Sequence, residues 1–342
     1  MRSLGFGRYT VCSCVAAAML AGCGGSQPPI GGPGAVPQIS AVASRGHRSS
    51  GPAGALVYVS DLIRNHVNAY DYPDGGLVLT LTGFTNPAGV CSDTNGNIFV
   101  LGNRNDNVIE YGHGAETPTQ TLNVPGWASA CAFDPNTGNL AVVVDSQTYG
   151  TGVAIFSSEQ GTPITYYSGA GTVIWHCGYD DKSDLFCDGQ TESVRAAFFA
   201  LGSGSGQISQ VPVSGGEFYD LSQIQWDGQY IAVTDTSFDT VSRITFTPVG
   251  STIDRIAGGW NGTVVSVTTL DKCGYNEAWS SWIYDGSIIA ACTLESPYQN
   301  QDKGRILIWN YPQGGHPANR IAKYETRPNL PDGVTISVSP SK

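Results

Sequence analysis

The stretch VCSDTNGNIFVLG (90–102) contains a short strand, an aspartate, a glycine turn and a second apolar strand. A similar order recurs in four further segments, of which the second has no glycine in its turn: CAFDPNTGNLAVVV (131–144), CGYDDKSDLFCDG (177–189), IQWDGQYIAVTD (224–235) and WIYDGSIIAACT (282–293). Aspartate suits such a corner because its side chain bonds its own turn, and glycine accepts positive φ. The repeat therefore predicts a series of β-hairpins.

A second motif follows the hairpins. It is a strand that ends in an aromatic residue, followed by a loop rich in glycine, proline and polar residues, in VNAYDYPDGG (67–76), NVIEYGHGAETP (107–118), GVAIFSSEQGTP (152–163) and RILIWNYPQGGHP (305–317). An outer strand such as TQTLNV (119–124) then completes a unit of four short strands. One such sheet cannot bury both of its faces, so the units must stack around an axis. This pattern is typical of β-propeller blades.

The two ends of the chain complete the repeat. ALVYVSD (55–61) matches a second strand with no first strand before it, and PDGVTISV (331–338) matches a first strand with nothing after it. Second strands begin near residues 56, 98, 140, 185, 230 and 288. We therefore predict an all-β, six-bladed propeller with four antiparallel strands per blade, closed by the C-terminal strand joining the N-terminal blade. The alternatives are a repetitive β-sandwich or a ring of five or seven blades.

The segment NPAGVCSDTNGNIFVLGNRNDNVIEY (86–111) resembles the repeat of NHL-type propellers, P-x-G-h-x-h-D-x-x-G-N-h-y-V-x-D-x-x-N-x-x-h-x-x-y. More loosely, the chain is similar to the six-bladed SMP-30/gluconolactonase-like group. The resemblance is good over 55–156, degraded over 185–260, and returns at 283–338. It implies the fold far more than an activity, because propellers share this pattern for reasons of packing.

The N-terminus reads as an export signal. Arg2 and Arg8 precede the short apolar run Val11–Leu20, and Leu20-Ala21-Gly22-Cys23 resembles the bacterial lipobox. The resemblance implies cleavage before Cys23 and a diacylglycerol on its sulfur, which makes residues 1–22 a lipoprotein signal peptide. Residues 23–54 are rich in Gly, Pro and Ser, and we expect a lipidated, disordered tether before a propeller domain over 55–342. The alternative is a plain signal peptide cut near Ala21.

These features predict an exported lipoprotein held in a lipid bilayer through acylated Cys23, facing the periplasm or the cell surface. Gly24 follows that cysteine and slightly favours the outer membrane. The net charge of −11, with no cluster of Lys and Arg in the folded part, argues against nucleic acid as a partner.

Six cysteines lie in the propeller segment, and an even number in an exported chain favours disulfides. If Asp180 pairs with Asp184 in its hairpin, Cys177 lies opposite Cys187. Hairpin and blade geometry further suggest Cys273 with Cys292 and Cys91 with Cys131. The alternative is buried free thiols.

The residues that lead into the innermost strands should surround the mouth of the central channel. We single out Asn86, Asp220, Glu277 and Asp332 there, because carboxylate and amide oxygens could hold Ca²⁺. The SMP-30-like enzymes use a Glu/Asn/Asn/Asp set in that region, but no motif position matches, so those roles are not transferred. The competing interpretation is that these side chains cap strands and bind channel water.

The sequence therefore favours a non-catalytic propeller that binds or scaffolds an extracytoplasmic ligand or protein. One alternative is a metal-dependent lactonase or lyase acting at the channel mouth. Another is a glycan-binding propeller, suggested by five tryptophans that could stack on sugar rings: Trp127, Trp175, Trp260, Trp279 and Trp282. A scaffold should show an exposed apolar or aromatic patch, and an enzyme should show a pocket that excludes water.

Overall fold

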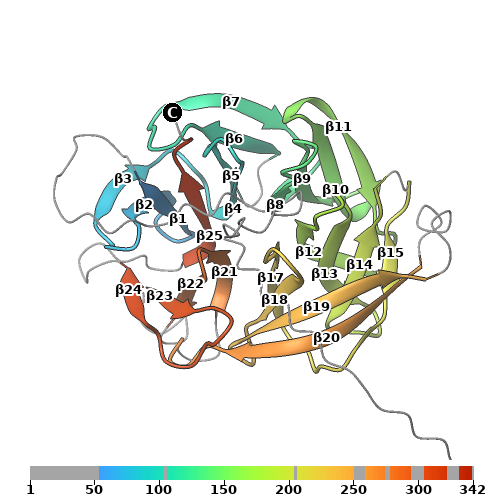
Figure 1. Ribbon diagram of the computed structural model, residues 1–342. Helices are drawn as coiled ribbons and strands as arrows, with labels where there is room; N and C mark the ends of the chain where they lie inside the picture. Colours follow the sequence, from blue (N-terminus) through green and yellow to red (C-terminus); the bar gives the residue numbers. More distant parts are fainter. Residues whose placement is uncertain are drawn as a thin grey trace, which may run out of the picture.

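The strands form a ring of six sheets around a central axis (Figure 1). The computed structural model describes residues 54–102, 106–203, 206–249, 259–273, 278–293, 304–321 and 331–340. These residues contain twenty-five β-strands and no helix. The six-bladed propeller predicted from the repeat is therefore confirmed.

Each blade has four antiparallel strands, which follow one another from the axis outward. Blade 1 contains β25 (Pro331–Val338), β1 (Ala55–Asp61), β2 (His66–Asp71) and β3 (Leu77–Leu81). Blade 2 contains β4 (Pro87–Ser92), β5 (Ile98–Gly102), β6 (Asn107–Tyr111) and β7 (Pro118–Asn123). Blade 3 contains β8 (Trp127–Phe133), β9 (Leu140–Ser146), β10 (Gly150–Ser157) and β11 (Gln160–Tyr167).

The second half of the ring repeats this order. Blade 4 contains β12 (Thr172–Tyr179), β13 (Leu185–Thr191), β14 (Ala197–Leu201) and β15 (Ser209–Val211). Blade 5 contains β17 (Leu221–Trp226), β18 (Ile231–Asp235), β19 (Thr240–Pro248) and β20 (Trp260–Thr269). Blade 6 contains β21 (Ala278–Tyr284), β22 (Ser287–Thr293), β23 (Gly304–Asn310) and β24 (Asn319–Ile321). The short β16 (Val213–Ser214) adds a parallel fifth strand to the edge of blade 5, which the repeat did not predict.

The C-terminal strand closes the ring. In blade 1, β25 pairs antiparallel with β1, so that Ala55 lies opposite Val338 and Val59 lies opposite Val334. The first strand of the chain thus gains its inner neighbour from the last strand, which covers the inner edge of β1.

The apolar core lies between the blades. Six hydrophobic clusters fill the six spaces between adjacent sheets. Because both faces of a blade are covered in this way, the second strands read as continuous apolar runs. In the second strand of blade 2, Ile98–Gly102, and in the third strand of blade 4, Ala197–Leu201, every residue is buried.

Two glycines allow the innermost strands to approach closely. A Cβ placed on Gly89 of β4 would lie 2.5 Å from the carbonyl oxygen of Ser129 in β8. A Cβ on Gly333 of β25 would lie 2.5 Å from the carbonyl oxygen of Ala88 in β4. Blades 1, 2 and 3 therefore pack closely where they meet at the axis.

The aspartates of the repeat perform the role expected of them. Oδ1 of Asp93 accepts hydrogen bonds from the backbone N–H groups of Asn95 and Asn97, at 2.9 and 2.7 Å. Oδ1 of Asp180 accepts from the N–H groups of Lys182 and Asp184 in the same way. These bonds fix the tight turns between first and second strands.

The six cysteines form the three disulfides that the blade arrangement suggested. Cys177 and Cys187 lie directly opposite one another on β12 and β13 and are bonded. Cys273 is bonded to Cys292 within blade 6, and the third disulfide, Cys91–Cys131, joins blade 2 to blade 3. Three disulfides indicate an oxidising environment outside the cytoplasm.

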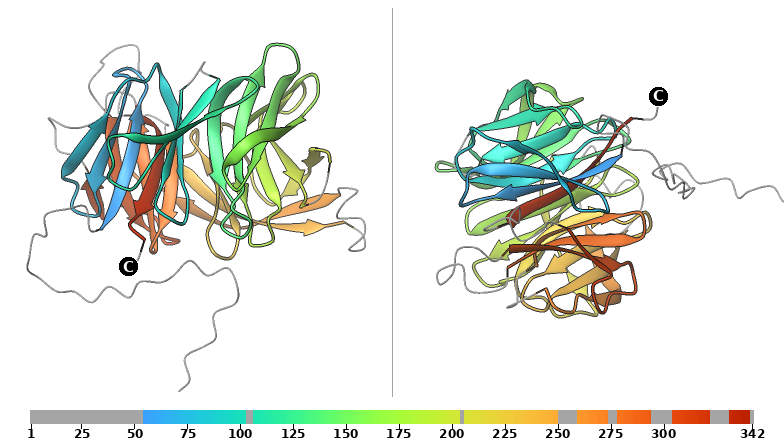
Figure 2. Two further views of the ribbon diagram at one scale, coloured as in Figure 1. Left: turned by 90° about the horizontal axis from the view of Figure 1, so that it is seen from above. Right: turned by 90° about the vertical axis from the view of Figure 1, so that its left-hand side faces the viewer.

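The ring has two distinct faces. We call the face at which the innermost strands begin the upper face, and the face at which they end the lower face. Ala55 and Val338 are paired at the lower face, so the described chain begins and ends there, as the position of the C-terminus in Figure 2 shows. Among the described residues there is no helix of the length and apolarity needed to cross a bilayer.

Candidate functional site: the central channel and the upper face

Every innermost strand carries a break in its pairing near its start. The register shifts within residues 87–90 of β4, 128–130 of β8, 174–177 of β12, 221–223 of β17, 278–280 of β21 and 331–334 of β25. A β-bulge twists the strand and redirects the side chain at the extra residue. Six bulges at one level therefore bring side chains from all six blades to the axis below the upper face.

These strands enclose a small polar cavity on the axis. Its volume is about 30 Å³, and residues from all six innermost strands line it. Its polar side chains are Ser129, His176, Gln223, Ser280 and Asp332. A space of this size holds about two water molecules, whereas sites for organic ligands usually exceed about 300 Å³.

Asp332 is the carboxylate of this cavity. Burial raises its pKa above the usual range for aspartate, and the charge of the nearby His176 partly offsets that effect. Asp332 occupies the position that Ala88 holds in the matching Pro-x-Gly-Val segment of β4. The repeat thus places one acidic side chain at the axis in blade 1 where blade 2 has a methyl group.

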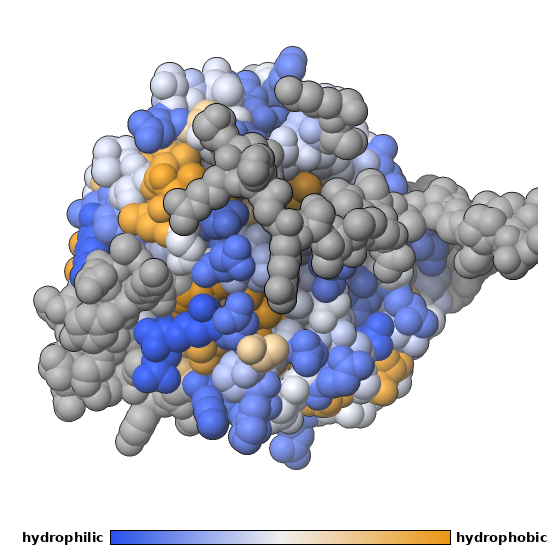
Figure 3. Space-filling model, turned by 60° about the vertical axis from the view of Figure 1, so that its left-hand side comes forward, coloured by the Kyte–Doolittle hydropathy of each residue, from blue (hydrophilic) through white to orange (hydrophobic). Residues whose placement is uncertain are grey.

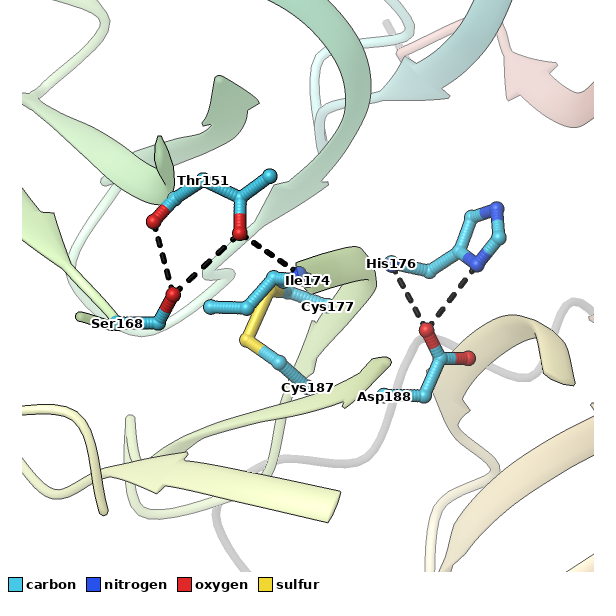
Figure 4. The surroundings of a disulfide bond; sticks show 7 residues. All are labelled: Thr151, Ser168, Ile174, His176, Cys177, Cys187 and Asp188. Carbon is cyan, nitrogen blue, oxygen red and sulfur yellow. Dashed lines mark hydrogen bonds and ion pairs between the residues drawn. A yellow bond between two sulfur atoms is a disulfide. The ribbon is translucent and has the colours of Figure 1, made fainter. Parts of the chain in front are cut away.

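His176 is held by a second, fully buried carboxylate. Its backbone N–H donates to Oδ1 of Asp188 at 2.8 Å, and its ring Nδ1 lies 3.2 Å from the same oxygen. Figure 4 shows the pair beside the Cys177–Cys187 disulfide, with the imidazole ring directed away from it. Asp188 has no exposed surface, and its Oδ2 has no hydrogen-bond partner. The pair fixes the orientation of the ring at the cavity wall.

The start of β12 is fixed independently from blade 3. The hydroxyl of Thr151 donates to the carbonyl oxygen of Thr172 and accepts from the N–H of Ile174, at 3.0 and 2.9 Å. The hydroxyl of Ser168 in turn donates to the carbonyl oxygen of Thr151 at 2.9 Å (Figure 4). The strand that carries His176 is therefore held by Thr151 at the start of its bulge and by Asp188 within it.

Of the four residues singled out at the channel mouth, Asp332 alone lines the cavity among those that the structure describes. Asp220 lies before β17, and its carboxylate accepts hydrogen bonds from Arg195 and Ser237. Asn86 lies in the connection before β4, where its N–H donates to the side chain of Asn65. Glu277 falls outside the described residues.

The described residues contain no group of three His, Cys, Asp or Glu side chains arranged to hold a metal ion. Within that part of the chain, Asp220 is already paired with the guanidinium of Arg195, and Asp332 lines the axial cavity without Asp220. The calcium site at the mouth stays a prediction.

The upper face carries an unusual share of the exposed apolar side chains. Over the described ranges thirteen large apolar side chains are exposed, and seven of them lie in upper-face loops or at the first residues of innermost strands: Ile63, Trp127, Tyr149, Val194, Tyr219, Phe238 and Trp279. Five others lie on outer strands. The remaining one, Val249, follows β19 in the part of the lower face that the structure describes. This asymmetry distinguishes the two faces.

Of the seven tryptophans in the chain, the five considered above for sugar binding separate into two groups. Trp127 and Trp279 are each 38% exposed and begin innermost strands at the upper face. Trp260 is buried, and Trp175 and Trp282 are partly buried against the clusters between blades. Most of the tryptophans thus serve packing, and two are accessible.

The loops of blades 4 and 5 bring several of these side chains together. Arg195 donates to Asp220 through Nε and Nη2, at 3.0 and 2.7 Å, and its guanidinium lies 4.0 Å above the ring of Tyr219. Val194 precedes the arginine, and Phe238 follows the Ser237 that also bonds Asp220. We call Val194, Arg195, Tyr219, Asp220 and Phe238 the blade 4–5 patch.

One side of the ring is shown in space-filling form in Figure 3. On the side shown in Figure 3, which carries blades 1 and 6, hydrophilic residues predominate and apolar residues occupy separate areas. The exposed apolar side chains of β3, Leu77 and Val78, belong to the outer edge of blade 1.

The blade 4–5 patch was not predicted from the sequence. Arg195 and Asp220, which are bonded, lie 25 residues apart in the sequence, and Asp220 and its other partner, Ser237, lie 17 residues apart, so no local motif joins them. The sequence indicates only that these residues lie in loops between strands.

Comparison with known proteins identifies the fold. No protein-family model and no curated protein matches the chain. A chain of a nidogen/laminin complex matches with a TM-score of 0.58 at 9% identity, over 84% of this chain and 99% of that one. The β-propeller domain of Cps50 (Swd1) from Myceliophteria thermophila gives 0.51 at 9%, over 80% and 87%. Hydrazine synthase from Kuenenia stuttgartiensis gives 0.52 at 12%, over 76% and 82%. At such identities the likeness shows the propeller fold and nothing finer.

Proposed function

We propose that this chain is a cell-envelope lipoprotein whose NHL-type propeller binds or scaffolds an extracytoplasmic partner through its upper face, without catalysis. The observation that carries this proposal is the collection of seven exposed apolar side chains on that face. Exposed apolar and aromatic groups on one surface mark interaction sites, because water solvates them poorly.

The position of the chain ends supports the same arrangement. The described chain begins at the lower face, where Ala55 pairs with Val338. A lipid on Cys23 would therefore attach the propeller from the side opposite the apolar loops. The upper face would stay accessible to a partner while the protein is held at a membrane.

A metal-dependent lactonase or lyase is the second candidate. Asp332 and His176 in the axial cavity favour it, because a carboxylate and an imidazole can move protons. The volume of about 30 Å³ argues against it, since a lactone ring needs several times that space.

A glycan-binding propeller is the third candidate, and Tyr149 favours it. This side chain is 63% exposed, and Trp127, on the innermost strand of the same blade, is 38% exposed. However, Tyr149 contacts Tyr167 with an angle of 38° between the ring planes, so the two do not form a flat platform for a sugar ring.

Lipid attachment is tested by expressing the full chain in a bacterium with ³H-palmitate and separating membrane from soluble fractions. We expect label in the membrane-bound protein, and loss of both label and membrane association in Cys23→Ser. Cys12→Ser, within the predicted signal peptide, is the matched control and should keep both. Unlabelled wild-type protein in the soluble fraction would overturn the anchoring.

Binding by the upper face is tested by converting its apolar side chains. Triple variants that carry serine at Trp127, Tyr149 and Phe238, or at the outer-strand residues Leu77, Ile164 and Val267, are compared for binding of the fluorescent apolar dye ANS. The upper-face variant should lose most of the dye signal and the outer-strand variant little. The reverse result would contradict the proposal.

A further inference from the structure

We propose that the blade 4–5 patch docks a protein whose contact surface presents one apolar side chain surrounded by lysine or arginine residues. This inference rests on the proposed function, because it assigns a site and a partner class to the upper face. Three features of the patch carry it: exposed apolar groups, a network that holds them in place, and the charge around them.

The patch contains three exposed apolar side chains and one exposed arginine. Val194, Tyr219 and Phe238 are 41, 47 and 49% exposed, and the side chain of Arg195 is 55% exposed. Tyrosine, phenylalanine and arginine are enriched where proteins bind proteins, because they offer large, semi-rigid contact areas.

A buried carboxylate fixes the two loops of blade 5 that support the patch. Asp235 is 1% exposed, and its Oδ2 accepts the N–H of Tyr219 at 2.6 Å while its Oδ1 accepts the N–H of Ser237 at 3.0 Å. Burial raises the pKa of Asp235, and these backbone hydrogen bonds partly offset the rise. The N–H of Thr236 also donates to the carbonyl oxygen of Asp220 at 2.8 Å.

Asp220 links blade 4 to this framework. Its Oδ1 accepts from Arg195, and its Oδ2 accepts from the hydroxyl of Ser237 at 2.9 Å. The exposed rings are thus attached to loops whose backbone is already ordered. Because these loops are ordered before a partner arrives, binding costs less conformational entropy.

The charge around the patch selects the partner. The loops at 191–196, 215–220 and 236–239 contain four carboxylates, from Glu192, Glu217, Asp220 and Asp239, and one guanidinium, from Arg195. Arg195 neutralises Asp220, but the other three carboxylates leave these loops with a net negative charge, which is complementary to an apolar side chain flanked by basic residues.

The same geometry disfavours a sugar. Arg195 already covers one face of the Tyr219 ring at 4.0 Å. The Asp220 carboxylate, which could accept hydrogen bonds from sugar hydroxyls, is engaged by Arg195 and Ser237. Val194 and Phe238 offer no hydrogen-bonding group. An apolar protein side chain would form more favourable contacts with this surface than a sugar would.

The test uses three synthetic twelve-residue peptides with one central Phe-Leu pair, flanked by lysines, by glutamates or by serines. Binding of each to the full propeller domain is measured by fluorescence anisotropy at low and at physiological salt. We expect the lysine peptide to bind at least tenfold more tightly than the glutamate peptide, with the difference shrinking as salt rises. Equal binding of the three peptides would overturn the inference.

The site is located with matched variants. Tyr219→Ala and Phe238→Ala should each weaken the lysine peptide about tenfold or more, whereas Val267→Ala, on the exposed outer strand β20, should not. Asp220→Asn tests the network: it should weaken binding while circular dichroism and the urea unfolding midpoint stay near wild type. Unchanged binding in both ring variants would overturn the inference.

Failure of this inference and failure of the proposed function give different results. If a peptide or a panel of oligosaccharides binds and is lost in Trp127→Ala or Tyr149→Ala instead, the upper face binds but the blade 4–5 patch is not the site. If binding is lost only through changes in lower-face turns, both proposals are wrong.

Discussion

Substitution of Gly333 by alanine tests the closure of the ring directly. A Cβ at this position would lie 2.5 Å from the carbonyl oxygen of Ala88, 2.8 Å from the N atom of Val90 and 3.1 Å from the Cα of Gly89. Ordinary contacts of a Cβ begin near 3.4 Å, so β25 and β4 must separate by about 0.9 Å. Overpacking of this kind costs about 1–3 kcal/mol.

Gly76 is the matched control for this substitution. A Cβ on Gly76 would meet nothing within 4 Å, and its φ lies outside the left-handed region. Gly76→Ala should therefore be neutral or stabilise the fold by up to about 1 kcal/mol, because alanine restricts the unfolded chain. The free energy of unfolding is measured by urea titration. Equal stability of Gly333→Ala and Gly76→Ala would refute the close approach of the C-terminal strand to blade 2.

Two further predictions concern stability. Replacing both Cys91 and Cys131 by alanine opens a loop with a sequence separation of 40 and should lower the free energy of unfolding by about 4 kcal/mol. The same change at Cys177 and Cys187, with a separation of 10, should lower it by about 3 kcal/mol. Urea unfolding of the two double variants measures both losses, and a larger loss of stability for the shorter loop would contradict the prediction. Burial raises the pKa of Asp180 to about 6, so the folded state binds its proton more tightly than the unfolded state, and this group's contribution to stability falls as the pH rises from about 4 to about 6. Asp180→Asn should remove that dependence and gain up to about 3 kcal/mol at pH 7, and an unchanged pH profile of stability would show that the carboxylate titrates normally.

The fold could be predicted because its determinants are local and repeated. Asp93, Asp134 and Asp180 each fix a turn with bonds inside that turn, so their spacing alone reveals the hairpins. The pairing of Cys177 with Cys187 follows from the register of one hairpin. Closure could be predicted because the segment at 331–334 repeats the segment at 87–90.

The functional surfaces could not be predicted in the same way, because they depend on contacts between loops of different blades. Asp220 resembled a free channel-mouth carboxylate, but Arg195 from the preceding blade bonds it. His176 meets Asp188 through a bulge in β12, which shifts the register that the hairpin alone would give. Sequence patterns place residues on strands and turns, but they do not say which loop side chains meet.

The channel and the upper face also differ in what the repeat requires of their residues. Positions at the axis must fit six strands together, which explains small residues such as Gly89 and Gly333 there. Loops of the upper face have no such constraint, so exposed rings such as Phe238 have no packing role that explains them.

Hydrogen–deuterium exchange with the lysine-flanked peptide bound tests most directly whether the upper face is the binding face. We expect slower exchange of backbone amides in the loops at 191–196, 215–220 and 236–239, and unchanged exchange in the lower-face turns at 93–97 and 134–139. Protection concentrated in those lower-face turns, with the upper-face loops unaffected, would contradict binding by the upper face.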